Sequence, residues 1–122
     1  MSGSRATSTS KTASQRGRAS RDKGKRFERQ IAALLRDRGL DAHRGVQYHG
    51  GPDSPDVTGL PGYHIECKAV ERLNVHEAFQ QSVRDAGEGE VPLVVHKKSR
   101  EDILVTLRFS DFLDLLEGKR YV

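Results

Sequence analysis

Two carboxylates and a lysine near the middle of the chain have the types and spacing that phosphodiester hydrolysis requires. Asp56 is followed, after nine intervening residues, by the triplet that runs from Glu66 to Lys68. Because side chains alternate on a strand, Glu66 and Lys68 project from one face, while Ile65 and Cys67 point to the other. An acid and a base opposite an apolar face are what a strand needs when it lines a cleft. The alternative is a cross-strand salt bridge on a solvated hairpin.

These carboxylates predict a site for a hard metal ion. If Asp56 enters the strand that neighbours Glu66, the two carboxylates and a main-chain carbonyl form an oxygen site that suits Mg²⁺ or Mn²⁺. An ion there polarises a phosphate and lowers the pKa of a bound water, and Lys68 adds a cation beside that water. Asp53 lies in the same loop and competes for the ligand role. We favour Asp56, because it leads directly into the strand.

The elements that must position these residues follow from periodicity and turn signals. Phe27, Ile31 and Leu35 recur at helical spacing, which predicts a helix from about residue 22 to Gly39. The order is helix, three short strands, helix, two strands, helix, which indicates an α/β domain with a central mixed sheet flanked by helices. The later elements are expected as strands over 40–47, 56–58, 63–70, 92–98 and 103–109, a helix over 75–86 capped by Asn74, and a helix over 111–117 capped by Ser110.

Charge is distributed unevenly along the chain. Residues 1–25 contain seven Lys or Arg against one acid, whereas the full chain has a net charge of +4. We therefore expect a disordered basic tail over 1–21 and one folded domain over 22–122. A basic tail raises affinity for a polyanion, although a solubilising role fits the same composition. The absence of a long apolar run and the single cysteine favour a cytoplasmic protein without a membrane span.

The histidines argue against a zinc nuclease built from local motifs. None of the five has an i, i+4 partner or another zinc-ligand spacing. His64 shares a strand face with Glu66 and is a candidate for substrate contact. Gln80 or Gln81, on the next helix, could orient the lysine or the water. Lys97 and Lys98 end a strand and are expected at backbone phosphates, with protection of the strand from aggregation as the alternative.

Two groups of residues resemble a known nuclease family. Pro55-Asp56 with Glu66-Cys67-Lys68 matches the PD-(D/E)XK signature. Lys23-Gly24, followed by Phe27-Glu28 at the start of the first helix, and Arg44 on the first strand resemble archaeal-type Holliday junction resolvases and their phage relatives. The resemblance covers about residues 23–109. It implies a small restriction-endonuclease-like domain that hydrolyses DNA.

The resemblance also implies roles for individual residues. Asp56, Glu66 and the main-chain carbonyl of Cys67 would bind Mg²⁺, with Mn²⁺ as a substitute. Lys68 would be the catalytic lysine, and Glu28 the outer acid that completes the site. Arg44 would contact a phosphate. Beside it, Lys23, Lys25, Lys97 and Lys98 are the further basic residues expected to bind DNA.

The implied assembly is a homodimer that nicks branched DNA, in the host cytoplasm if the protein is encoded by a phage. The loop His49-Gly50-Gly51 departs from the Ser-Gly pair of the archaeal enzymes, so other substrates stay open. The alternatives are another PD-(D/E)XK nuclease of the repair or restriction type, or a non-catalytic DNA-binding module of the same fold. A sequence-specific enzyme would need more chain for base readout than is present here.

Overall fold

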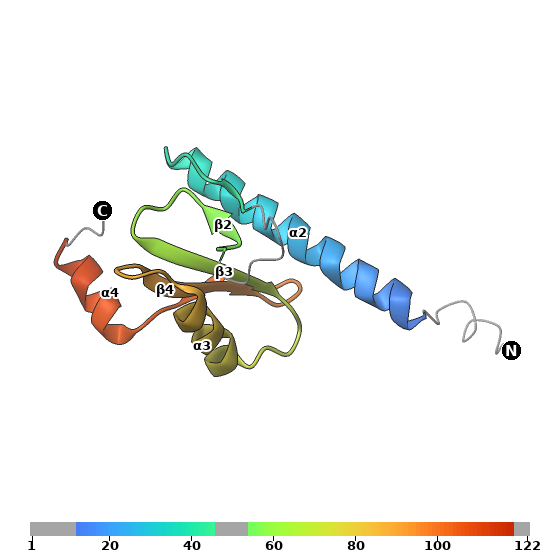
Figure 1. Cartoon of the computed structure of the whole chain (residues 1–122). Helices are drawn as coiled ribbons and strands as arrows, with labels where there is room; N and C mark the ends of the chain where they lie inside the picture. The colour runs from blue at the N-terminus through green and yellow to red at the C-terminus, as the bar shows by residue number, and fades with distance from the viewer. Residues whose placement is uncertain (1–11, 46–53, 119–122) are drawn as a thin grey trace, which may run out of the picture.

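A five-stranded mixed sheet with helices against it organises the computed structural model, which describes residues 12–45 and 54–118 (Figure 1). The strands lie in the order β1-β2-β3-β4-β5, with β3 and β4 parallel and the other pairs antiparallel. This confirms the expected α/β class and order of elements. The elements are α2 (Ala13–Asp37), β1 (His43–Arg44), β2 (Val57–Thr58), β3 (Tyr63–Ala69), α3 (Val75–Asp85), β4 (Val91–Lys97), β5 (Leu104–Thr106) and α4 (Phe109–Leu116).

Helix α2 covers one face of the sheet and provides much of the core. Phe27 and Ile31, one helical turn apart, are both buried. They pack in one cluster with Ile65 and Cys67 of β3. The alternating residues of β3 therefore point toward α2, as the sequence pattern predicts.

Helix α3 packs on the opposite face of the sheet, where β3 meets β4 (Figure 1). Its N-cap is Asn74, whose side chain accepts a hydrogen bond from the Glu77 N–H at 3.1 Å, as expected. Its buried Ser82 hydroxyl lies 3.3 Å from the carbonyl oxygen of His64 and 3.2 Å from that of Leu93, and can donate to either. This serine links the helix to both central strands.

The N-terminal half of α2 corrects the expectation of disorder through residue 21. The helix begins at Ala13, after a capping box in which Thr12 and Gln15 exchange hydrogen bonds. The segment has no apolar period, and its side chains over 13–22 contribute no buried residue to the described core. Its Ala, Arg and Gln residues nevertheless favour a helix, which the buried turns that follow can propagate. Residues 1–11 lie outside the described part of the chain.

Three further boundaries differ from the sequence prediction. In the described part of 40–47 only His43 and Arg44 form a strand, and residues 46–47 lie outside it. The strand expected over 103–109 is limited to Leu104–Thr106, where β5 pairs with β4. Helix α4 begins at Phe109 with Arg108 as N-cap, so Ser110 lies in its first turn and the predicted cap was wrong. No helix among the described residues is long and apolar enough to cross a membrane.

Candidate active site

The antiparallel pairing of β2 with β3 places two of the predicted acids opposite each other. Val57 pairs with Ile65, and the Asp56 N–H donates to the Ile65 carbonyl at 2.9 Å. In this register Asp56 faces Glu66 across the two strands. The Oδ2 atom of Asp56 accepts a hydrogen bond from the Cys67 N–H at 2.8 Å. Asp56 is therefore held against the main chain of the Glu-X-Lys triplet.

Glu66 is a buried carboxylate, with 3% of its surface exposed. Burial raises its pKa above the ordinary value, and the negative charge of Asp56 raises it further, while His64 acts in the opposite direction. Glu66 and Asp56 are thus close enough to repel each other when both are ionised. A bound cation would relieve that repulsion, so the pair fits a divalent metal ion.

Glu28 joins this edge of the sheet from helix α2. Its Oε1 accepts a hydrogen bond from Arg44 Nε at 2.8 Å, and only 17% of its side chain is exposed. Burial raises the pKa of Glu28, the charge of Asp56 adds to the shift, and Arg44 opposes it. The Gly45 N–H donates to the Asp56 carbonyl at 2.8 Å, and a Cβ at this glycine would collide with the Pro55 carbonyl. Glycine is required here for β1 to lie beside Asp56.

A cavity of about 490 Å³ opens beside this edge of the sheet. It is lined by Arg21, Gly24, Lys25, Glu28, Arg44, Gly45 and Asp56. The structure thus brings together two predicted acids and two of the predicted DNA contacts, Lys25 and Arg44. Arg21 also belongs here and was missed by the sequence prediction. Its i, i+4 and i+7 spacing with Lys25 and Glu28 is the signal that could have found it.

The fourth predicted catalytic residue, Lys68, lies near these acids but lines a different cavity, on the α3 side of the sheet. That cavity measures about 430 Å³, and Gln81 and Arg84 also line it. Cys67 connects the two groups. Its thiol has a pKa raised by burial, by Asp56, by Glu28 and by Glu66, and lowered by Lys68. All four predicted catalytic charges therefore lie around Cys67, whose thiol is too poor an acid to act as a nucleophile.

The three predicted acids do not converge on one point. Across residues 12–45 and 54–118, the group of three or more metal-binding side chains with donor atoms within 4.8 Å is His64, Glu66 and Asp85. Glu28 and Asp56 both lie outside this group. His64 is fully buried, which argues against the direct substrate contact for which it was a candidate. Asp85 was missed because its proximity arises only when α3 packs on β3.

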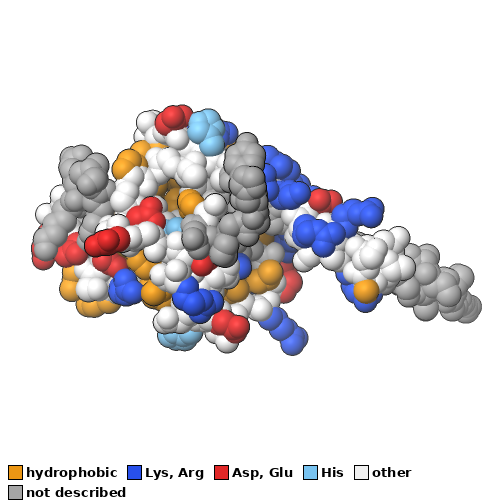
Figure 2. Space-filling view, viewed as in Figure 1, with side chains coloured by type: hydrophobic (Ala, Val, Ile, Leu, Met, Phe, Trp, Pro, Cys, Tyr) orange, Lys and Arg blue, Asp and Glu red, His pale blue; other side chains and the backbone are white. Residues whose placement is uncertain are grey.

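A second basic cavity, of about 430 Å³, lies on the other flank of the same turns of α2. Its basic residues are Lys23, Arg26, Lys97, Lys98 and Arg100. Basic side chains also continue along the helix where it projects beyond the sheet, as the space-filling view shows (Figure 2). The remaining predicted DNA contacts are thus gathered in one place. Arg26 and Arg100 join them and were missed by the sequence prediction.

Part of the predicted site lies outside the described residues. Asp53, the alternative to Asp56 as a metal ligand, lies among residues 46–53, which the structure does not describe. The loop His49-Gly50-Gly51 lies there too. The hydrogen bond of Asp56 to Cys67 favours Asp56 as ligand, and the choice between the two stays a prediction.

A mixed sheet in which an acid directly before β2 faces a Glu-X-Lys strand defines the class of PD-(D/E)XK nucleases. Residues 19–122 match the model of one family of this class, described as "Phage putative PDDEXK endonuclease". The match covers most of the chain, and the protein belongs to this family of nucleases. No curated protein and no solved structure matches the chain.

Proposed function

We propose that the protein is a divalent-metal-dependent endonuclease that hydrolyses phosphodiester bonds in branched DNA, with four-way junctions as substrate and the host cytoplasm as its place of action. The observation that carries the proposal is the fixed position of Asp56 opposite Glu66, held by the hydrogen bond from the Cys67 N–H, in a chain of an endonuclease family.

Each residue of this edge has a distinct role in the proposed reaction. Asp56, Glu66 and the Cys67 carbonyl hold Mg²⁺, or Mn²⁺ in its place, as a hard oxygen site. The ion, when bound, supplies Lewis-acid activation of the phosphate and of a water molecule. Lys68 stabilises negative charge that develops on the phosphate, and Gln81, in the same cavity, orients it. Glu28 receives the proton of the attacking water and is kept in place by Arg44.

The two basic cavities support a backbone-directed mode of DNA binding. Lys25 and Arg44 contact the phosphates next to the scissile bond. Lys23, Lys97 and Lys98 contact a second stretch of backbone on the other flank of α2. Phosphate contacts fix position and carry no base sequence. Two separate tracks that diverge around one helix suit two arms of a branched substrate better than one straight duplex.

An exposed apolar surface supports the proposal that the enzyme is a homodimer. The surface consists of the edge strand β5 and helix α4. Phe109 and Leu116 are 72% and 68% exposed, and none of the residues of α4 is buried. Apolar patches and open strand edges of this kind mark contact sites. If two copies of β5 pair antiparallel about Val105, Asp102 of one copy lies opposite Arg108 of the other, so the charges match.

The dimer is tested by measuring molar mass with light scattering. The Val105→Lys variant is expected to reduce the mass from that of two chains to that of one, because the charge disrupts strand pairing. Leu34→Lys, which alters an exposed leucine on α2, is the control and should stay dimeric. A wild-type chain that is monomeric at high concentration would contradict the dimer.

Cleavage of a DNA panel tests the proposed activity. The panel contains a synthetic four-way junction, a fork and a matched linear duplex, each incubated with Mg²⁺ and with chelator. We expect paired, symmetric nicks at the junction that require the ion. Equal cutting of all three substrates would support the nuclease assignment and contradict the preference for junctions. Junction binding without any cutting would favour a non-catalytic binding module.

A further inference from the structure

His64 is the buried polar side chain for which the proposed nuclease chemistry has no direct use. Only 1% of its side chain is exposed. Neither of its ring nitrogens has a hydrogen-bond partner. An imidazole buried in this way loses its hydration without recovering the lost hydrogen bonds, which is unfavourable unless something else binds it.

Carboxylates surround this imidazole. Its Nε2 lies 3.7 Å from Glu66 Oε1, and its Nδ1 lies 3.8 Å from Glu90 Oε1. Glu90 Oε1 already accepts a hydrogen bond from the Gly87 N–H at 2.6 Å. Asp85 approaches from the end of α3, and one donor atom each from His64, Glu66 and Asp85 lie within 4.8 Å of one another. Three acids thus face one imidazole.

The distances suit an ion better than direct hydrogen bonds. A gap of 3.7 Å is too long for a hydrogen bond between nitrogen and oxygen. It is short enough for both atoms to bind one ion, because Zn²⁺ lies about 2.0–2.2 Å from nitrogen and carboxylate oxygen ligands. Asp85 gives a second reason to expect a cation. It is the last residue of α3, where a carboxylate meets the negative end of the helix dipole and is unfavourable without a positive charge beside it. No Lys or Arg forms an ion pair with Asp85 among the described residues.

We propose that His64, Glu66 and Asp85 form a second metal site, which binds a borderline transition-metal ion of the zinc type. One nitrogen and two carboxylate oxygens, with a fourth position for water, make a three-ligand zinc site. The site differs in donor chemistry from the oxygen site of Asp56 and Glu66, which suits Mg²⁺. Glu66 belongs to both sites. An ion at His64 therefore either competes with the catalytic ion for the Glu66 carboxylate or shares that carboxylate with it.

The proposal depends on the geometry around His64 and does not require the proposed DNA cleavage. Direct metal binding therefore tests it, with Zn²⁺ alone as the probe and the metal-free full chain as the protein. Calorimetry gives the stoichiometry and affinity, and NMR of the histidine ring nitrogens reports which imidazole is coordinated. We expect one Zn²⁺ per chain and a shift of the His64 ring signals.

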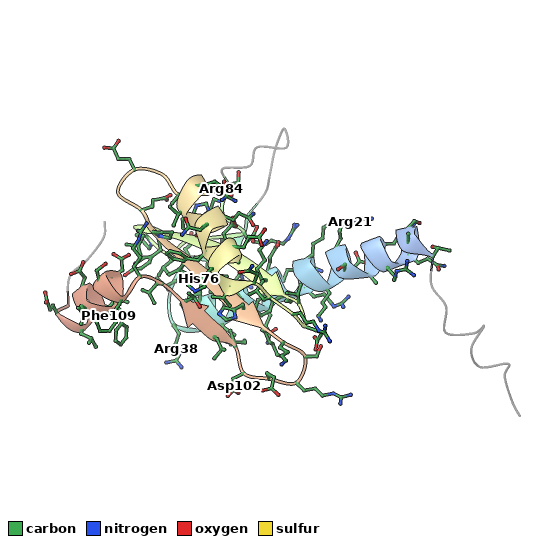
Figure 3. All side chains as sticks on the ribbon, turned by 90° about the horizontal axis from the view of Figure 1, so that it is seen from below. Arg21, Arg38, His76, Arg84, Asp102 and Phe109 are labelled. Atoms are coloured by element: carbon green, nitrogen blue, oxygen red, sulfur yellow. The ribbon has the colours of Figure 1, made fainter. Side chains whose placement is uncertain are left out.

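Two variants remove one ligand each and two serve as matched controls. His64→Gln and Asp85→Asn should each weaken Zn²⁺ binding by at least about tenfold. His76→Gln, which removes an exposed histidine of α3 (Figure 3), should bind Zn²⁺ as the wild type does. Asp56→Asn should also retain binding, because Asp56 belongs to the oxygen site. Asp85 is only partly buried, so its variant tests the site even if His64→Gln does not fold.

Several results would overturn this second site. If the wild-type chain shows no saturable Zn²⁺ binding, the metal site is excluded, and the contact of His64 with Glu66 is an ion pair. Wild-type affinity in the Asp85→Asn variant would exclude Asp85 as a ligand. Loss of Zn²⁺ binding in Asp56→Asn would mean that the ion occupies the catalytic oxygen site. Each of these results is independent of whether the protein cuts DNA, so a failure here leaves the proposed nuclease untouched.

Discussion

The two faces of strand β3 carry opposite kinds of residue although they alternate along one chain segment. Toward α2, Ile65 and Cys67 pack in an apolar cluster. Toward α3, His64 and Glu66 are equally buried but carry polar and ionisable groups. The first face gains free energy when water leaves it, and the second loses free energy when its charges are desolvated. The first face positions the strand, and the second carries ionisable groups whose burial is unfavourable for folding.

The comparison predicts that folding and activity can be separated by substitutions on alternate residues of one strand. Changes on the α3 side should remove catalysis from a protein that still folds. Substitutions of residues on the α2 side should lower the free energy of unfolding, while the molecules that remain folded keep their cleavage activity.

Replacing Lys68 by Ala should have the largest effect on activity. We expect the single-turnover rate to fall on the order of 10²–10³-fold, because the charge that develops on the phosphate loses a fixed cation. The unfolding midpoint should stay near that of the wild type. Arg84→Ala removes a cation that lines the same cavity and is the matched control. An equal loss in both variants would show that the cavity needs positive charge but no particular lysine.

Replacing Ile65 by Ala should have the largest effect on stability. Ile65 is 1% exposed, and truncation of a buried isoleucine typically costs about 2–5 kcal/mol. Urea unfolding measures this change. The cleavage rate per folded molecule should stay within a few-fold of the wild type in the cold. A large loss of rate in fully folded Ile65→Ala would contradict the division between the two faces.

The basic cavity at the end of β4 includes neither Ile65 nor Lys68, and substitutions of its lysines should affect only DNA binding. The double substitution Lys97→Ala and Lys98→Ala should weaken DNA binding uniformly across sequences and reduce the slope of log affinity against log salt by about two. Arg38→Ala, at the far end of α2 from Arg21 (Figure 3), is the control. An unchanged slope in the double variant would remove these lysines from the DNA interface.

The smallest expected effect is a change in the dependence of stability on pH. Burial and Asp56 raise the pKa of Glu28 above its ordinary value of 4.5. The folded state therefore binds a proton more readily than the unfolded state, so wild-type stability falls as pH rises from 4.5 through the raised pKa. In Glu28→Gln this contribution is absent. Unfolding measured across this range should give a flatter curve for the variant, and parallel curves would contradict the assignment.

The sequence predicted the strand β3 and the faces of its residues well because the signals are local. Alternation placed Ile65 and Glu66 on the correct faces, and the short turn before Tyr63 predicted the pairing that brings Asp56 to Glu66. The early start of α2 was missed, since a helical segment with no buried residue shows no apolar period. Asp85 was missed for a different reason. Its neighbours His64 and Glu66 are distant in sequence and meet it only when α3 packs on the sheet.

The measurement that tests the central claim most directly is metal-dependent cleavage by the Asp56→Asn variant. Asparagine keeps the size of the side chain and an oxygen that can accept the Cys67 N–H, while the negative charge is removed. We predict that the variant folds as the wild type does and that its Mg²⁺-dependent cleavage of DNA is abolished. Cleavage at the wild-type rate would contradict the assignment of Asp56 and Glu66 as the centre of a nuclease site.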